Sequence, residues 1–347
     1  MSDAFISYSG PDIDFVRHLF VISPDSATSD ICGLETEHAV NPYKQMVPAV
    51  WKDAEMCMKS VSSELGLDES LFRSSFFANQ LMMRKFSVSK QQIRQFETDG
   101  FLMVRDLFSA EEMDLLLQIS KSDTEKQDQL HSAPDTEGRE SRLWLTSEPR
   151  EDIYNAFARC HRVSEAMEKL LGHEIYLYHY KMMVKEAKVG GRWEWHQDYG
   201  YWYHNHCLYP DMGSVVIAVD PATTANGCLQ VIKGSHRCGR IEHGRFGNQT
   251  GADPKRVDLL LQNLEHVYCE MEQGDALFFH ANLLHSSDPN QSDKPRWLMI
   301  CCYNSRHNPC NDLPGHPSYR YMEKWPDDRI VEVGCQQWTE MRSVAED

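Results

Sequence analysis

The stretch that decides the fold is Trp193-Glu194-Trp195-His196-Gln197-Asp198-Tyr199. Successive side chains of a β-strand point to opposite faces, so His196 and Asp198 are expected to project from the same face. The predicted strand covers residues 192–198 and presents one nitrogen and one oxygen ligand side by side. The sequence therefore predicts two adjacent metal-coordinating positions where this strand ends.

A third candidate ligand, His285, lies far downstream, after a turn and strand predicted at 274–280. Two histidines and one carboxylate on one face of an octahedral ion leave three positions open, as in non-haem Fe(II) oxygenases. The same donors suit a zinc hydrolase, but the helical His-Glu-x-x-His motif typical of those enzymes is absent. The three residues therefore favour iron.

Arg296 opens a largely apolar strand predicted at 296–303. A guanidinium in such a strand needs a buried anionic partner or a route to water. A dicarboxylate co-substrate, held bidentately, is one such partner. An ion pair with an internal acidic residue is the structural alternative.

Four segments in the same order are similar to the phytanoyl-CoA dioxygenase family of Fe(II)/2-oxoglutarate oxygenases. They cover residues 91–101, 195–202, 226–236 and 285–296. The similarity extends from about residue 87 to at least Asn304. Four motifs in the right order are far more specific than any one of them.

The resemblance implies a mainly β fold with flanking helices, a double-stranded β-helix of the jelly-roll, cupin-like kind. It implies Fe(II) bound by His196, Asp198 and His285, with 2-oxoglutarate and O2 as co-substrates. The expected reaction is hydroxylation of a C–H bond with release of succinate and CO2. Because related halogenases lack the carboxylate ligand, Asp198 favours hydroxylation.

Three further residues are assigned to 2-oxoglutarate by the same resemblance. Arg296 is expected to clamp its distal carboxylate and Ser287 to donate a hydrogen bond to it. Lys181 lies where the family places a co-substrate contact, although the family residue there varies. Ser287 has the alternative of a turn-forming serine.

Hydrophobic periodicity supports the same architecture. From residue 175 onward the period is two, with many short predicted strands, which is typical of a sandwich or jelly roll. The catalytic domain is predicted to span 87–347, preceded by a helical extension, 1–86, with helices within 42–65 and 71–83. Ser87 or Ser89 is expected to cap a helix over 90–98, and residues 109–112 form a capping-box pattern. Residues 121–150 are predicted to form a surface excursion or mobile flap, and residues 305–347 an irregular tail.

Composition limits the possible partners. The 347 residues include 35 Lys and Arg against 52 Asp and Glu, a formal charge of −17. Such a chain repels nucleic acid and anionic membrane surfaces. The 11 cysteines lack CxxC spacing and indicate reduced, mostly buried thiols. With no signal peptide or membrane-length apolar run, a cytoplasmic location is expected. The sequence does not indicate an oligomeric state.

The substrate prediction depends on three aromatic residues after the metal motif: Tyr201, Trp202 and Tyr203. They either pack the loop or line the substrate pocket, whereas Trp193 and Trp195 are expected to face away from the metal. Aromatic faces favour ammonium groups, so we expect a small, polar, amine- or ammonium-bearing substrate. The alternatives are an acyl-CoA or phosphonate substrate, or a non-catalytic protein that binds metal and 2-oxoglutarate.

Overall fold

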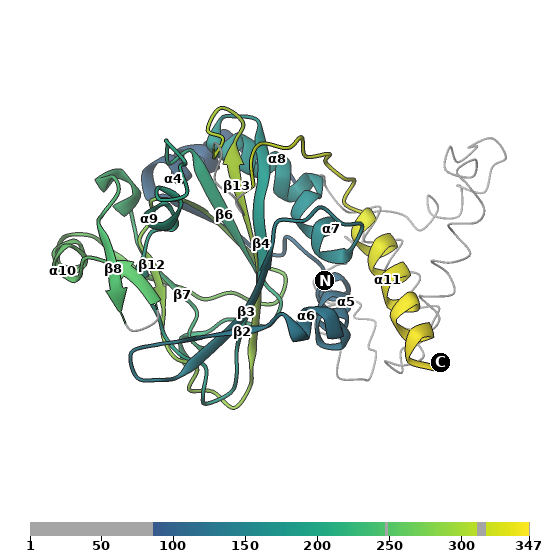
Figure 1. Cartoon of the computed structure of the whole chain (residues 1–347). Coiled ribbons are helices and arrows are strands. Elements are labelled where there is room, and N and C mark those ends of the chain that lie inside the picture. Colours follow the sequence, from purple (N-terminus) through teal and green to yellow (C-terminus); the bar gives the residue numbers. More distant parts are fainter. Residues whose placement is uncertain (1–85, 247–248, 311–316, 347) are drawn as a thin grey trace, which may run out of the picture. The chain divides into compact units, whose positions relative to one another are not determined.

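The computed structural model describes residues 86–246, 249–310 and 317–346 (Figure 1). All of them belong to one compact unit, Lys52–Asp347. The predicted extension 1–86 lies outside the described residues apart from Phe86, as do both helices predicted within it. The domain boundary near residue 86 therefore stays a prediction.

The described residues form two antiparallel sheets, one of 7 strands and one of 4. In order across it, the larger sheet contains β1 (Phe101–Val104), β11 (Ala276–His280), β6 (Met212–Ala218), β13 (Arg296–Ser305), β4 (Ile175–Lys185), β3 (Glu140–Thr146) and β2 (His131–Pro134). The smaller sheet contains β10 (His266–Cys269), β7 (Leu229–Ile232), β12 (His285–Ser287) and β5 (Trp193–His196). A separate hairpin pairs β8 (His243–Phe246) with β9 (Gln249–Ala252). Strands distant in sequence are thus neighbours, as a jelly roll requires.

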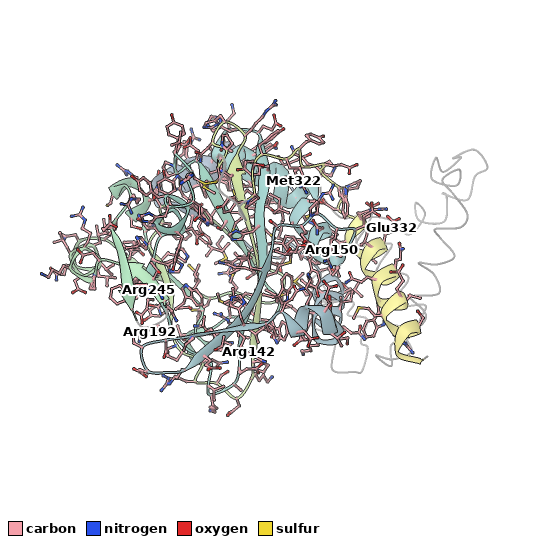
Figure 2. All side chains as sticks on the ribbon, viewed as in Figure 1. Arg142, Arg150, Arg192, Arg245, Met322 and Glu332 are labelled. Carbon is pink, nitrogen blue, oxygen red and sulfur yellow. A yellow bond between two sulfur atoms is a disulfide. The ribbon has the colours of Figure 1, made fainter. Side chains whose placement is uncertain are left out.

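The alternation of side chains along the larger sheet produces two hydrophobic layers. Val216 and Leu277 point inward and belong to one cluster with Val231 of the smaller sheet. Their neighbours Ile217 and Phe278 point outward and pack in a second cluster with the helices. Figure 2 shows side chains filling the space between the two sheets. The predicted mainly β fold class is thus confirmed.

The helices lie mostly on the outer face of the larger sheet, where Figure 1 shows α5, α7, α8 and α11. The bounds of the helices are α4 (Lys90–Asp99), α5 (Ala110–Ser122), α6 (Thr124–Asp128), α7 (Ile153–Arg159), α8 (His161–Leu171), α9 (Asp198–Trp202), α10 (Pro254–Asn263) and α11 (Arg329–Glu346), with short 3-10 turns η3 (Thr224–Asn226) and η4 (Ser235–Cys238).

Local capping signals are confirmed at the first two helices. Ser89 caps α4 through a capping box with Gln92, and α4 ends at Gly100, whose φ of 84° suits a residue without a Cβ. Ser109 and Glu112 form the predicted capping box of α5. These short-range interactions depend on neighbouring residues, which is why the sequence reveals them.

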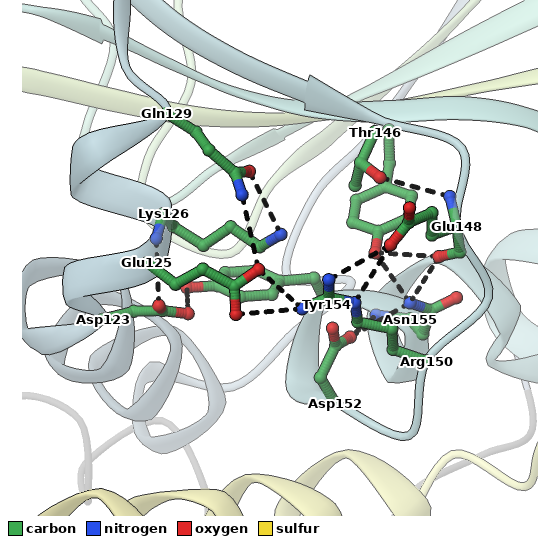
Figure 3. A network of polar contacts seen from close by, with 11 residues as sticks. Asp123, Glu125, Lys126, Gln129, Thr146, Glu148, Arg150, Asp152, Tyr154 and Asn155 are labelled. Atoms are coloured by element: carbon green, nitrogen blue, oxygen red, sulfur yellow. Dashed lines mark hydrogen bonds and ion pairs between the residues drawn. The ribbon is translucent and has the colours of Figure 1, made fainter. Parts of the chain in front are cut away.

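The segment 121–150, predicted to be a surface excursion or flap, is mostly exposed but has regular structure. It forms α6 and the strands β2 and β3, and β3 pairs with β4 of the larger sheet. Figure 3 shows the polar network that holds it against α7. In this network Arg150 contacts Glu125 at 2.9 Å, and Asn155 donates to the hydroxyl of Tyr180 at 2.7 Å. The polar side chains of residues 121–150 are thus largely paired with one another or with α7. Amino-acid composition alone cannot distinguish such paired residues from those of a loop.

The predicted irregular tail is partly wrong. Residues 317–325 have little regular structure, but Arg329–Glu346 forms α11. Ile330, Val333 and Cys335 of this helix are buried in the outer hydrophobic cluster. The helix is therefore stabilised by packing against α5 and α7.

The cysteines differ from the expectation in one place. Cys207 and Cys310 form a disulfide with a Cα–Cα distance of 4.8 Å, whereas the other described cysteines are free. The two residues meet because β6 and β13 pair with Met212 opposite Asn304, a proximity that sequence spacing does not reveal. In the described part of the chain, no helix has the length and apolar character to span a membrane.

Candidate metal and 2-oxoglutarate site

His196 is the last residue of β5 and is buried between the sheets. Its Nδ1 lies 2.7 Å from the carbonyl oxygen of Glu194. A backbone carbonyl only accepts hydrogen bonds, so Nδ1 carries the proton and Nε2 keeps its lone pair. The ring thus offers Nε2 as a metal ligand.

His285, the first residue of β12, is arranged in the same way. The two histidines are directly paired across β5 and β12, with ring centroids 4.0 Å apart. Nδ1 of His285 lies 2.9 Å from the carbonyl oxygen of Leu283, which again leaves Nε2 free. Antiparallel pairing therefore places two Nε2 donors side by side.

Asp198 completes the group, but it does not lie in the strand as predicted. The strand ends at His196, and Asp198 is the first residue of the short helix α9. Its Oδ2 accepts a hydrogen bond of 2.7 Å from the hydroxyl of Ser214. Its Oδ1 lies 4.0 Å from Nε2 of His196 and 3.8 Å from Nε2 of His285. Fixing one oxygen on Ser214 leaves the other directed at both imidazoles.

The electrostatics of these three residues favour a cation. Burial lowers the pKa of His196 well below its usual value, and nearby His285 lowers it further. Burial also lowers the pKa of His285, against the opposing effect of the Asp198 carboxylate. Both rings are therefore neutral at pH 7 and need not lose a proton to bind a metal.

The donor atoms of the three residues all lie within 4.8 Å of one another. One carboxylate and two neutral imidazoles leave a buried negative charge that a divalent ion would compensate. The hydrogen bonds to Glu194, Leu283 and Ser214 orient the ligands, as outer-shell partners do in metal sites. The residues fit a 2-His-1-carboxylate iron centre.

Arg296 lies in the same cavity and is fully buried at the start of β13. Its Nη1 donates to the carbonyl of Gly227, while Nε and Nη2 have no hydrogen-bond partner among the described residues. Burial lowers the pKa of Arg296 to about 10. A buried guanidinium with unused donors can receive a carboxylate. The alternative of an internal ion pair is not seen, because Nε and Nη2 contact no acidic side chain among the described residues.

Ser287 and Lys181 line the same cavity. The Ser287 hydroxyl accepts a hydrogen bond of 2.8 Å from Nζ of Lys185, so its own proton remains available to an anion. Lys185 is buried, which lowers its pKa well below the usual value, and Arg296 lowers it further. Lys185 lies on β4 with Lys181, and no role was predicted for it from the sequence.

The three aromatic residues predicted to bind substrate have different environments. The ring of Tyr201 lies 5.5 Å from that of His196, and its hydroxyl donates to the carbonyl of Thr250 at 2.6 Å. Trp202 is buried, in edge contact with Tyr178. Tyr203 is 48% exposed, with the guanidinium of Arg240 over its ring at 4.2 Å. Tyr201 is the one beside the candidate ligands.

Two residues of the site escaped the sequence prediction. Trp193 was expected to face away, yet it lines the cavity, because the pairing of β5 with β12 shifts register between His285 and Ser287. Ser214 was missed as the partner of Asp198. The sequence does show Ser214 as a polar residue within the apolar strand β6. Whether its hydroxyl points at Asp198, however, depends on how the two sheets face each other.

Comparisons with known proteins concern the sequence family and the fold. The sequence profile of the family "Phytanoyl-CoA dioxygenase (PhyH)" matches residues 96–297. L-proline trans-4-hydroxylase from Streptomyces griseoviridis is 32% identical over 168 residues, 43% of this chain and 60% of that protein. Ectoine dioxygenase from Bordetella parapertussis is 26% identical over 243 residues, 65% of this chain and 78% of that protein. The chain thus spans less than two thirds of the proline hydroxylase.

Solved structures with a similar fold include EctD from S. alaskensis with 2-oxoglutarate and 5-hydroxyectoine, at a TM-score of 0.59 and 22% identity, covering 69% of this chain and 89% of that one. The epimerase SnoN from nogalamycin biosynthesis has a TM-score of 0.53 at 18% identity, covering 69% and 96%. These likenesses concern the fold and support the predicted jelly roll. The family profile covers more than half of the sequence and includes every candidate ligand. The chain therefore belongs to the phytanoyl-CoA dioxygenase family, which confirms the predicted class of Fe(II)/2-oxoglutarate-dependent dioxygenases.

Proposed function

We propose that this protein hydroxylates a small, polar, amine- or ammonium-bearing metabolite, with Fe(II) held by His196, Asp198 and His285. The observation that carries the proposal is a buried ligand group sharing one cavity with Arg296, whose Nε and Nη2 have no partner in the described structure. Bound there, Fe(II) with 2-oxoglutarate and O2 supplies the oxidising chemistry that converts a C–H bond to an alcohol, releasing succinate and CO2.

The chain's own residues would position the co-substrate. Arg296 offers two donors to the distal carboxylate of 2-oxoglutarate, and Ser287 offers its hydroxyl proton beside it. Lys185 fixes the Ser287 oxygen, and Lys181 extends into the same cavity from β4. This arrangement fixes the dicarboxylate between the arginine and the metal ligands before substrate enters.

Apolar side chains would exclude water from the reaction. The cavity is lined by residues such as Leu229, Phe279, Leu298 and Ile300 in addition to the polar groups. Its enclosed free volume is about 30 Å³, well below the roughly 300–1,000 Å³ of ligand pockets. Lining side chains must therefore move to admit 2-oxoglutarate and a substrate, which favours a small substrate.

The chemistry of the substrate is supported by two observations. Trp193 and Tyr201 present aromatic rings close to His196, and such faces attract ammonium groups. The relatives named for proline and ectoine act on small molecules. Trp202 is not carried into this proposal as a substrate contact, because its ring is buried against Tyr178 and His179.

An anionic substrate, such as an acyl-CoA or a phosphonate, is the second candidate. It is favoured by five basic residues in the segment 237–256: Arg237, Arg240, Arg245, Lys255 and Arg256. Arg240 is already paired with Glu242 at 2.6 Å, which weakens this support. A non-catalytic binding protein is the third.

The test is to follow succinate formation by the Fe(II)-loaded protein with panels of amino acids, ammonium solutes, phosphonates and acyl-CoAs. Cyclic or N-substituted zwitterions are expected to stimulate succinate formation and to yield a product heavier by one oxygen. Turnover of an acyl-CoA with no response to any solute would refute the substrate class. Binding of iron and 2-oxoglutarate without succinate under any condition would favour the non-catalytic alternative.

A matched pair of variants tests the aromatic contact. Tyr201→Phe keeps the ring and loses only the hydrogen bond to Thr250, whereas Tyr201→Leu removes the ring face. A substrate ammonium on this ring predicts a higher KM in Tyr201→Leu than in Tyr201→Phe, by about 2- to 30-fold for a contact of about 0.5–2 kcal/mol. Equal KM values would argue against the contact.

A further inference from the structure

A second group of two histidines and one aspartate lies outside the catalytic cavity. It consists of His173, Asp211 and His307, whose ligand atoms all lie within 4.8 Å of one another. His307 Nε2 is 2.8 Å from Oδ2 of Asp211, and the rings of His173 and His307 are 4.3 Å apart between centroids. Both histidines are exposed and Asp211 is half-buried, so an ion can reach them from solvent.

The backbone brings these residues together through the pairing of three strands. His173 precedes β4, Asp211 precedes β6 and His307 follows β13, and Figure 1 shows the three strands side by side. Ser305 of β13 is opposite Ile175 of β4. The same register places Asn304 opposite Met212. The three ligands therefore converge on one end of the larger sheet from three separate loops.

The neighbouring charges leave the three residues available. Glu174 accepts hydrogen bonds from Arg306 at 2.8 Å and from the hydroxyl of Tyr319 at 2.9 Å. Glu174 and Arg306 are therefore paired with each other. Asp211 provides the negative charge beside the two imidazoles. Two nitrogens and one carboxylate oxygen form a donor set that suits Zn²⁺, which accepts water as the fourth ligand.

We propose that His173, Asp211 and His307 form a solvent-accessible Zn²⁺ site that is distinct from the iron centre. The ion replaces the direct contact between His307 and Asp211 with bonds from both residues to one metal. Asp211 ends the 203–211 segment, which starts at α9, the helix that carries Asp198. Zinc therefore ties this segment to the ends of β4 and β13, close to the disulfide Cys207–Cys310.

The experiment is a zinc titration of metal-free, tag-free protein by equilibrium dialysis and calorimetry. The wild type is expected to bind two equivalents, because the iron ligands also accept zinc. The double variant His173→Gln/His307→Gln is expected to bind one, and so is His196→Gln/His285→Gln. The variant that combines all four substitutions is expected to bind none.

Stability gives a second readout that is independent of activity. In the His196→Gln/His285→Gln background, zinc is expected to raise the Tm, since a ligand that binds only the folded state stabilises it. Adding His173→Gln and His307→Gln is expected to remove that rise. The controls are His131→Gln, at an exposed histidine of β2 outside both groups, and Cys238→Ser, at an exposed free thiol.

The proposal is overturned if the His196→Gln/His285→Gln variant binds no zinc, or if its zinc persists after loss of His173 and His307. It is also overturned if Cys238→Ser alone abolishes the second equivalent. If the proposed iron site were wrong, the result would be different: the zinc equivalent that depends on His196 and His285 would be missing in the wild type.

Discussion

The protein carries the same three side-chain types twice, once inside the jelly roll and once on its rim. In the interior, each candidate ligand is oriented by a hydrogen bond to a residue outside the group. Glu194 holds His196, Leu283 holds His285 and Ser214 holds Asp198. On the rim, the carboxylate of Asp211 bonds directly to His307. The interior group is oriented before any ion arrives, whereas the rim group must rearrange.

Burial makes the second difference. A buried carboxylate between two neutral imidazoles has no water to solvate its charge, so a dication is strongly favoured there. On the rim, water already solvates the charge, and an ion gains less. The types of ligand residue alone therefore do not define a metal site. The orientation of the ligands and their removal from water set the affinity for the ion.

The largest effect is expected from removing the interior carboxylate. Asp198→Ala leaves two neutral imidazoles and no negative charge, so stoichiometric Fe(II) binding and succinate formation are expected to fall to background. His196→Ala should do the same. Metal analysis after anaerobic reconstitution is the measurement, with His131→Gln as a control that keeps both properties. Full iron content in either triad variant would disprove the assignment.

The next effect concerns the co-substrate. Arg296→Ala is expected to leave iron in place and to weaken 2-oxoglutarate binding at least about 30-fold, because loss of a buried charge partner costs about 2–5 kcal/mol. Titration of the Fe(II) protein with 2-oxoglutarate measures this.

The matched control is Arg142→Ala, at an arginine on β3 (labelled in Figure 2) that is 41% exposed and is not among the residues that line the cavity. Its titration curve should match the wild type. If both variants bind 2-oxoglutarate like the wild type, Arg296 does not hold the co-substrate.

A smaller effect separates a positioning residue from a ligand. Ser214→Ala releases Oδ2 of Asp198 without removing a ligand, and outer-shell changes of this kind cost about 10–100-fold in metal affinity. The KM for 2-oxoglutarate is expected to stay unchanged. Ser141→Ala removes a similarly buried hydroxyl, which donates to the carbonyl of Gly191 at 3.0 Å. Ser141→Ala should lower stability without changing iron affinity. Equal iron affinities in Ser214→Ala and Ser141→Ala would therefore argue against a role of Ser214 in positioning Asp198.

The smallest effect is a pH dependence of the metal-free protein. The pKa values of His196 and His285 are lowered in the folded state, whereas an unfolded histidine has a pKa of about 6.5. Below this value the unfolded chain binds more protons, so the free energy of unfolding falls as pH decreases. The maximum slope is about 1.4 kcal/mol per pH unit for each imidazole. Denaturant titrations from pH 7 to 5 should show a shallower slope in His196→Gln/His285→Gln than in the wild type.

Local and alternating patterns allowed much of this to be predicted. Capping at Ser89 and Ser109, the short strands and the candidate ligands all depend on neighbouring residues or on a recognisable order of motifs. The same information did not reveal the strands β2 and β3 within 121–150, nor did it reveal α11. Paired polar side chains resemble those of a loop, and α11 depends on packing against α5 and α7.

By itself, the sequence determined the family, the mainly β class and the identity of His196, Asp198, His285 and Arg296 as candidates. Only the tertiary structure decided that Asp198 starts a helix and is held by Ser214, that Trp193 turns into the cavity, and that a second group gathers around Asp211. The physical reason is that residue type and alternation are encoded locally. Strand register and the facing of two sheets, by contrast, are set by contacts between segments far apart in the chain, such as Met212 with Asn304.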